Sequence, residues 1–176
     1  MDKYIFPGGG PTHFDLPQSK SWFNRALILG ALKKESVKLI GSPQSSDTDQ
    51  IIFCLKQMGL VIHQTDSEIL ITNSFPECEI SGAPPLELEL GDGGTTVRFL
   101  IAFCALGRRK YIFNVTERMS ERPIEPLLDA LVDGNVSISK GQKLFPLELR
   151  GPLSFQDGPE VDCSLSTQFY TALKLA

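Results

Sequence analysis

The 176-residue chain has few of the residues that build metal sites. It contains 2 His, and its 4 Cys lie far apart without a Cys-x-x-Cys pair. This spacing excludes a zinc ribbon and disfavours a histidine-rich metal site. No stretch reaches the roughly 18 consecutive apolar residues of a membrane span, and the first residues lack the features of a secretory signal. We therefore expect a cytoplasmic protein with free thiols, no metal and no membrane partner.

The chain also lacks a basic excess. Its 17 Lys and Arg residues against 21 Asp and Glu residues give a formal charge of −4, whereas proteins that bind nucleic acid electrostatically usually carry more cations. Hydrophobic residues make up 41% of the chain and charged residues 22%, a balance typical of globular domains. The composition therefore predicts a folded chain and argues against a nucleic-acid partner.

Two similar blocks and the start of a third follow one another along the chain. The first predicts helices over 20–33 and about 45–58, with strands near 36–40, 60–64 and 68–72. The second predicts helices from about 94 to 106 and 123 to 133, with strands near 86–90, 111–115, 136–139 and 147–150. The third predicts a strand near 160–162 and a helix from about 166. Arg25 and Arg98 take equivalent places, 73 residues apart. We expect one partial domain over 1–176, with units at about 14–75 and 86–151 and an incomplete third unit from about 160.

The hydrophobic pattern predicts where the helices and strands lie. Residues 99–106 are apolar almost all round, which is typical of a buried helix. Residues 87–90, 136–139 and 147–150 alternate apolar and polar side chains, as strands with one solvent-facing side do. A doubly wound α/β protein would show the reverse pattern. We therefore predict a mixed α/β (α+β) fold of repeated βαβαββ units, with helices inside and sheets outside.

Polar clusters stand where the first helix of each block begins. They are Ser19-Lys20-Ser21 with Arg25, Gly93-Gly94-Thr95 with Arg98, and Ser166-Thr167-Gln168. Unpaired N–H groups at helix N-termini attract anions, and cations and hydroxyls strengthen such sites. If the three helices run parallel, the clusters converge on one substrate with several anionic groups. Each cluster alone is equally well explained as an ordinary helix cap or turn, and the charged residues 117–122 as a solvated loop.

Four motifs in order connect these clusters. They are LPQSKS at 16–21 with NRAL at 24–27, LGDGGTTVR at 90–98, ERPI at 121–124, and SLSTQF at 164–169. Together they resemble the signature segments of the EPSP synthase (3-phosphoshikimate 1-carboxyvinyltransferase) family. The resemblance implies two domains, each an inside-out barrel of three βαβαββ units, of which this chain holds a truncated first domain.

The resemblance also implies the reaction and the residues that serve it. The enolpyruvyl group of phosphoenolpyruvate is transferred to the 5-hydroxyl of shikimate 3-phosphate and phosphate is released, without metal or cofactor, in the shikimate pathway to chorismate and aromatic amino acids. By position, Lys20 is the catalytic residue and contacts both substrates. The other implied ligands are Ser21, Arg25, Ser166, Thr167 and Gln168 for shikimate 3-phosphate, and Gly94 and Arg122 for phosphoenolpyruvate. The role of Arg98 stays open.

The sequence departs from the family pattern at several places. Asp92 stands where the family usually has Asn, so its carboxylate would weaken anion binding unless a cation pairs with it. Ser120 replaces a Lys, Thr167 replaces a Ser, and the segment 133–135 is shorter than usual. These changes indicate either lineage variation or relaxed function.

The largest departure from the family pattern is that the chain does not include the second domain, which supplies the family's general-base aspartate. We expect the chain alone to bind substrate without turnover, with the C-terminal domain of the same enzyme as its missing partner. One alternative is a non-catalytic anion-binding or structural domain from a split or decayed gene. A relative of the UDP-N-acetylglucosamine enolpyruvyl transferases is disfavoured, because residues 18–21 replace that enzyme's SGAKN-type opening and no catalytic Cys loop is evident.

Overall fold

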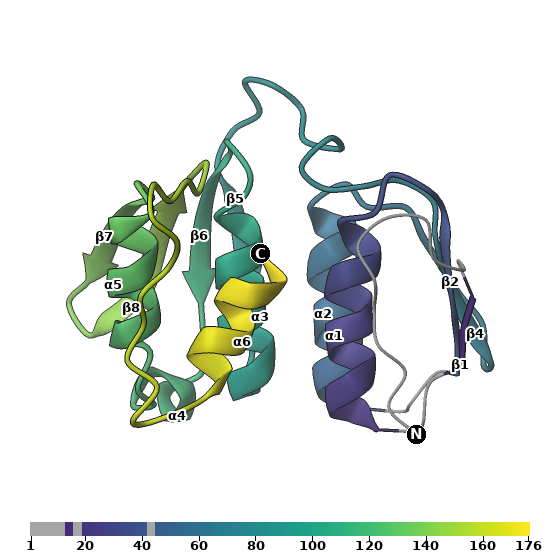
Figure 1. Ribbon diagram of the computed structural model, residues 1–176, viewed down its shortest axis with the longest axis horizontal. Coiled ribbons are helices and arrows are strands. Elements are labelled where there is room, and N and C mark those ends of the chain that lie inside the picture. Colours follow the sequence, from purple (N-terminus) through teal and green to yellow (C-terminus); the bar gives the residue numbers. More distant parts are fainter. Residues whose placement is uncertain (1–12, 16–18, 42–44) are drawn as a thin grey trace.

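The computed structural model describes residues 13–15, 19–41 and 45–176, and places helices between two sheets (Figure 1). The first unit contains β1 (His13–Asp15), α1 (Lys20–Ala31), β2 (Val37–Ile40), α2 (Ser46–Gln57), β3 (Ile62–Gln64) and β4 (Glu68–Ile71). The second contains β5 (Leu86–Glu89), α3 (Gly94–Cys104), β6 (Lys110–Asn114), α4 (Glu117–Ser120), α5 (Glu125–Asp133), β7 (Ser137–Gly141) and β8 (Leu144–Arg150). The helix α6 (Gln168–Leu175) follows them.

The two sheets share one topology. Their strand orders are β1-β2-β4-β3 and β5-β6-β8-β7, and in each sheet the first pair is parallel and the others are antiparallel. His13 pairs with Lys38 and Leu86 pairs with Tyr111, so both partners recur after 73 residues, as Arg25 and Arg98 do. The repeated βαβαββ architecture is therefore confirmed, whereas the expected unit boundaries stay a prediction.

The interior is formed mainly by helices. Every residue of α3 from Thr96 to Cys104 is buried, because this helix packs against α1, α2, α5 and α6. On the sheets, burial alternates along the strands, and Tyr111 and Phe113 of β6 point inward. The prediction of helices inside and sheets outside is confirmed (Figure 1).

Three local predictions were wrong or incomplete. The expected strand at 160–162 is irregular chain, and no strand in the described residues pairs with it. Part of the expected charged loop forms α4, because the Thr116 hydroxyl accepts a hydrogen bond from Met119 N and Met119 is buried. The strand β1 was not expected; three residues give little pattern, and pairing with β2 defines it. Among the described helices, none has the length and apolarity to cross a bilayer.

Candidate anion-binding site

The first turns of four helices surround one pocket of about 530 Å³. Lining residues from helices are Lys20 of α1, Ser46, Asp47 and Gln50 of α2, Gly94, Thr95 and Arg98 of α3, and Gln168 of α6. Leu90 to Gly93 and Arg122 complete the lining. Since first-turn N–H groups have no partner within their helix, they make this end of the bundle electropositive. The prediction that the three polar clusters converge is confirmed for Lys20, Gly94 and Gln168.

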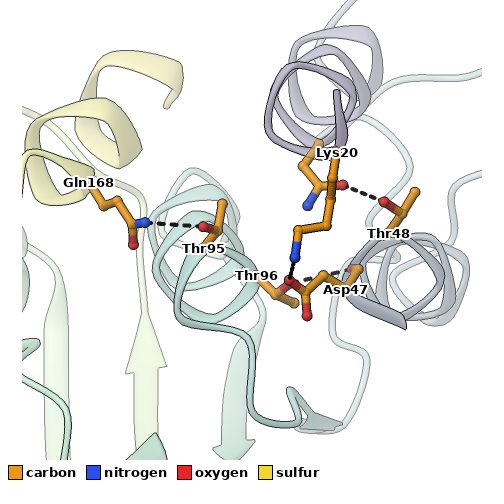
Figure 2. Close-up of polar contacts among 7 residues, drawn as sticks. Lys20, Asp47, Thr48, Thr95, Thr96 and Gln168 are labelled. Carbon is orange, nitrogen blue, oxygen red and sulfur yellow. Dashed lines mark hydrogen bonds and ion pairs between the residues drawn. The ribbon is translucent and has the colours of Figure 1, made fainter. Parts of the chain in front are cut away.

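Polar contacts connect α1, α2 and α3 at the pocket (Figure 2). Lys20 Nζ lies 2.7 Å from Asp47 Oδ2, and the lysine side chain is 54% exposed. The Thr96 hydroxyl donates to the Asp47 carbonyl oxygen at 3.3 Å. Between α1 and α2, the buried Thr48 hydroxyl donates to Asn24 Oδ1 at 2.8 Å. These bonds fix the spacing of the helices and hold the Lys20 ammonium beside the pocket.

Two guanidinium groups meet at the first residue of α3. A Cβ atom added to Gly94 would lie 2.6 Å from Arg98 Nη1 and 3.2 Å from Arg122 Nη1. Within the described residues no carboxylate forms an ion pair with either arginine. Burial, and secondarily the charge of Arg122, lower the pKa of Arg98. The two cations and the helix N-terminus together create a site that favours an anion with more than one charged oxygen.

The first residue of α6 joins this site through its side chain. Gln168 Nε2 donates to the Thr95 hydroxyl at 3.2 Å (Figure 2), and Gln168 Oε1 accepts from Arg98 Nη1 at 2.7 Å. Both bonds reach residues of α3, 73 and 70 positions earlier in the chain. The amide group of Gln168 is therefore held at both ends against the pocket wall.

Four of the expected ligand residues are not among those that line the pocket: Ser21, Arg25, Ser166 and Thr167. Arg25 Nη1 donates to the carbonyl oxygen and the hydroxyl of Ser21, and its guanidinium lies 5.5 Å from the centre of the Phe99 ring. The Ser166 hydroxyl accepts from Gln168 N at 3.2 Å, and Thr167 is an exposed N-cap residue. Their roles toward shikimate 3-phosphate stay predictions.

The sequence did not predict that residues of α2 would line the pocket. At the start of α2, the Ser45 side chain makes no cap hydrogen bond, and the Asp47 carboxylate pairs with Lys20. Nothing local to a Ser-Ser-Asp cluster distinguishes a cap from a partner of a lysine 27 residues away. Gln50 also lines the pocket and donates to the Glu89 carbonyl oxygen.

The unusual carboxylate at position 92 has a cation beside it. Asp92 Oδ2 lies 3.1 Å from Arg118 Nη1, and Asp92 Oδ1 accepts from the Thr116 hydroxyl at 3.1 Å. Arg118 belongs to α4, so this short helix supplies the counter-ion that the sequence left undefined. Among the described residues, no group of three or more His, Cys, Asp or Glu side chains could hold a metal ion.

Comparison with known proteins agrees with this geometry. The family model for EPSP synthase (3-phosphoshikimate 1-carboxyvinyltransferase) matches residues 12–176. The chain belongs to the EPSP synthase family. A curated 3-phosphoshikimate 1-carboxyvinyltransferase from Pseudomonas syringae pv. tomato is 36% identical over 161 residues, which cover 91% of this chain and 38% of that protein. The chain thus spans well under half the length of this EPSP synthase relative.

Solved structures show the same fold. EPSP synthase from Acinetobacter baumannii superposes with a TM-score of 0.77 at 21% identity, covering 93% of this chain and 37% of that one. The enolpyruvyl transferase NikO from Streptomyces tendae gives a TM-score of 0.55 at 13% identity, covering 88% of this chain and 35% of that one. The predicted enolpyruvyl-transferase-like fold is confirmed for this member of the EPSP synthase family.

Proposed function

We propose that this chain is the substrate-binding part of a 3-phosphoshikimate 1-carboxyvinyltransferase. This enzyme would transfer the enolpyruvyl group of phosphoenolpyruvate to the 5-hydroxyl of shikimate 3-phosphate. The observation that supports the proposal most strongly is the convergence of Lys20, Gly94, Arg122 and Gln168 on one pocket. Two guanidinium groups lie there without a carboxylate partner in the described residues. A phosphate and a carboxylate on one substrate suit that charge.

The proposed chemistry is an addition followed by an elimination. The 5-hydroxyl oxygen gives up its proton to the general base and attacks C2 of phosphoenolpyruvate while C3 gains a proton. The tetrahedral intermediate then loses phosphate from C2 and a proton from C3, which restores the double bond of the enolpyruvyl group. In this scheme, Arg122 and the α3 N-terminus at Gly94 bind and orient phosphoenolpyruvate. Lys20 stabilises the negative charge that shifts between carboxylate and phosphate oxygens. Its half-exposed side chain is held at the pocket by Asp47, where the proposal places both substrates.

The shikimate 3-phosphate site is proposed around both ends of the same pocket. Lys20 and Gln168 line it, and Ser21, Arg25, Ser166 and Thr167 follow or precede them in the chain. Hydroxyls and a guanidinium are suitable donors for a phosphate and for ring hydroxyls. Arg25 and Ser21 bond to each other in the structure, so substrate binding would exchange that bond for bonds to phosphate.

The proposal includes a partner and a location. The remainder of the longer relatives would supply the general base and further cations, so we expect this chain alone to release no phosphate from the two substrates. The partner would then be the second domain of the same enzyme. The cytoplasmic location expected from the sequence stays a prediction.

Calorimetric titration of the chain with shikimate 3-phosphate tests the proposal. We expect saturable binding at millimolar ligand or tighter, weakened at least tenfold (about 1.4 kcal/mol) by Lys20→Met. The matched control is Lys56→Met, because Lys56 is exposed on α2 and does not line the pocket. A folded chain that shows no heat of binding at millimolar ligand would overturn the proposal.

A non-catalytic domain is the second candidate. Asp92 favours it, because this residue of the pocket lining departs from the Asn that the enzyme family usually has there. The two candidates differ in selectivity. A substrate-binding part of the enzyme should bind shikimate 3-phosphate much more tightly than inorganic phosphate, since ring hydroxyls add hydrogen bonds. Equal affinity for the two ligands in parallel titrations would favour the non-catalytic candidate.

A further inference from the structure

Arg98 connects three of the segments that carry the proposed ligands. Its side chain belongs to α3, is only 6% exposed and lies along the pocket wall. One guanidinium nitrogen, Nη1, donates to Gln168 Oε1 at 2.7 Å, and the other, Nη2, donates to the Pro123 carbonyl oxygen at 2.7 Å. Pro123 directly follows Arg122. A single buried group therefore joins the α3 N-terminus to the segments that present Arg122 and Gln168.

The hydrogen bond from Arg98 to Gln168 determines whether the amide presents its oxygen or its nitrogen to the pocket. Because Oε1 accepts from Arg98, Nε2 lies on the opposite side, where it donates one hydrogen to the Thr95 hydroxyl at 3.2 Å. A glutamine amide carries two N–H donors, and within the described residues Nε2 makes one hydrogen bond, to Thr95. The reversed amide would present its oxygen, which repels a phosphate or carboxylate. An anionic substrate thus needs the orientation that Arg98 imposes.

The geometry argues that Arg98 acts through its neighbours rather than on a ligand. Each terminal nitrogen donates a hydrogen bond to a protein acceptor in another segment, and Nε is buried without a partner in the described chain. The guanidinium carbon lies 5.2 Å from the centre of the Phe169 ring, so the aromatic ring contacts the group as well. A lysine at this position could not reproduce the planar fork that reaches two acceptors in different segments.

We propose that Arg98 is a positioning residue that fixes the Gln168 amide with its Nε2–H toward the pocket, where it donates to the anionic substrate. The inference rests on the proposed function. It adds that the donor character of Gln168 depends on a residue 70 positions away in another unit.

A double-mutant cycle with shikimate 3-phosphate as the probe tests the coupling. We expect Arg98→Lys and Gln168→Met each to weaken binding roughly tenfold, as loss of a charge-assisted hydrogen bond does, and the double variant to bind no more weakly than the worse single variant. Independent losses that multiply to about a hundredfold would overturn the proposal, because Arg98 would then act on the ligand separately. Absence of binding by the unmodified chain would instead overturn the proposed function.

The side-chain amide resonances of Gln168 give a readout without ligand. These resonances are assigned in the ¹⁵N spectrum of the unmodified chain by their disappearance in Gln168→Met. Their chemical shifts should differ from those of a solvated glutamine amide. In Arg98→Lys, the shifts should move back toward the solvated values. Solvated positions in the unmodified chain would overturn the proposal even if binding were intact. Where Arg98→Lys fails to fold, Thr95→Val removes the Nε2 acceptor instead and should weaken binding about two- to tenfold. Unchanged affinity in a folded Thr95→Val would contradict the fixed amide.

Discussion

At the scale of single residues, Gly94 is the position where an added side chain would meet both guanidinium groups. A Gly94→Ala methyl would lie 2.6 Å from Arg98 Nη1, which is buried and cannot retreat without breaking a bond to Gln168 or Pro123. We expect affinity for phosphoenolpyruvate to fall about tenfold (about 1.4 kcal/mol) in calorimetric titration. The matched control is Gly30→Ala, which adds the same methyl to α1 away from the pocket and should leave affinity unchanged.

The charge at Asp92 can be tested by an isosteric change. Asp92→Asn keeps an acceptor for the Thr116 hydroxyl and removes the ion pair with Arg118, an exposed pair that contributes little stability. Anion affinity should rise about two- to fivefold at low salt and less at 0.5 M salt, where charges are screened within a few ångströms. Titrations at both salt concentrations measure this. Asp66→Asn, in an exposed turn, is the control, and an equal gain there would contradict a local effect.

At the scale of elements, α3 is the helix on which both units depend. Leu100 is fully buried where α3 meets its neighbouring helices, so Leu100→Ala should lower the free energy of unfolding by about 2–5 kcal/mol. Leu165 is 66% exposed, and Leu165→Ala should change the free energy of unfolding by under about 0.5 kcal/mol. Urea denaturation of both variants makes the comparison. Similar midpoints for the two variants would argue against the packing described for α3.

The reactivity of the cysteine thiols gives a second test of how deeply α3 is buried. Cys104 in α3 is fully buried, and burial raises its pKa well above the usual value. Cys78 is partly exposed and its pKa is raised to about 11, mainly by desolvation. Because only the thiolate reacts, alkylation of Cys78 should accelerate with each pH unit up to about 11, while Cys104 should react only after unfolding. Mass spectrometry of alkylated peptides locates the label. Native labelling of Cys104 as fast as Cys78 would contradict the burial.

The predictability of each element follows from the range of its interactions. The continuous apolar segment of α3 and the alternating strand β8 could be predicted because their burial follows the local pattern of hydrophobic residues. The helix α4 could not, since it depends on one hydroxyl cap at Thr116 and the burial of Met119. The strand at 160–162 was expected as the start of a third repeat, but no described strand pairs with this segment.

At the scale of the whole molecule, the internal repeat explains why the site forms. Equivalent helices of two units, followed by α6, place Lys20, Gly94 and Gln168 at one end of the bundle because α1, α3 and α6 pack against one another. The repeat therefore made the convergence predictable from sequence. The partners that tune it were not predictable: Asp47 meets Lys20 across 27 residues and Arg98 meets Gln168 across 70, contacts that only the packed structure defines.

The most direct test of the central claim is one ¹⁵N-edited titration of the chain with shikimate 3-phosphate. A single anion site built from four segments predicts that the backbone amides of Lys20, Gly94, Arg122 and Gln168 shift together, with one common dissociation constant. Amides of the outer sheets, such as those of β3 and β7, should not move. Shifts confined to one segment, or different dissociation constants for different segments, would contradict the claim that the motifs form one site.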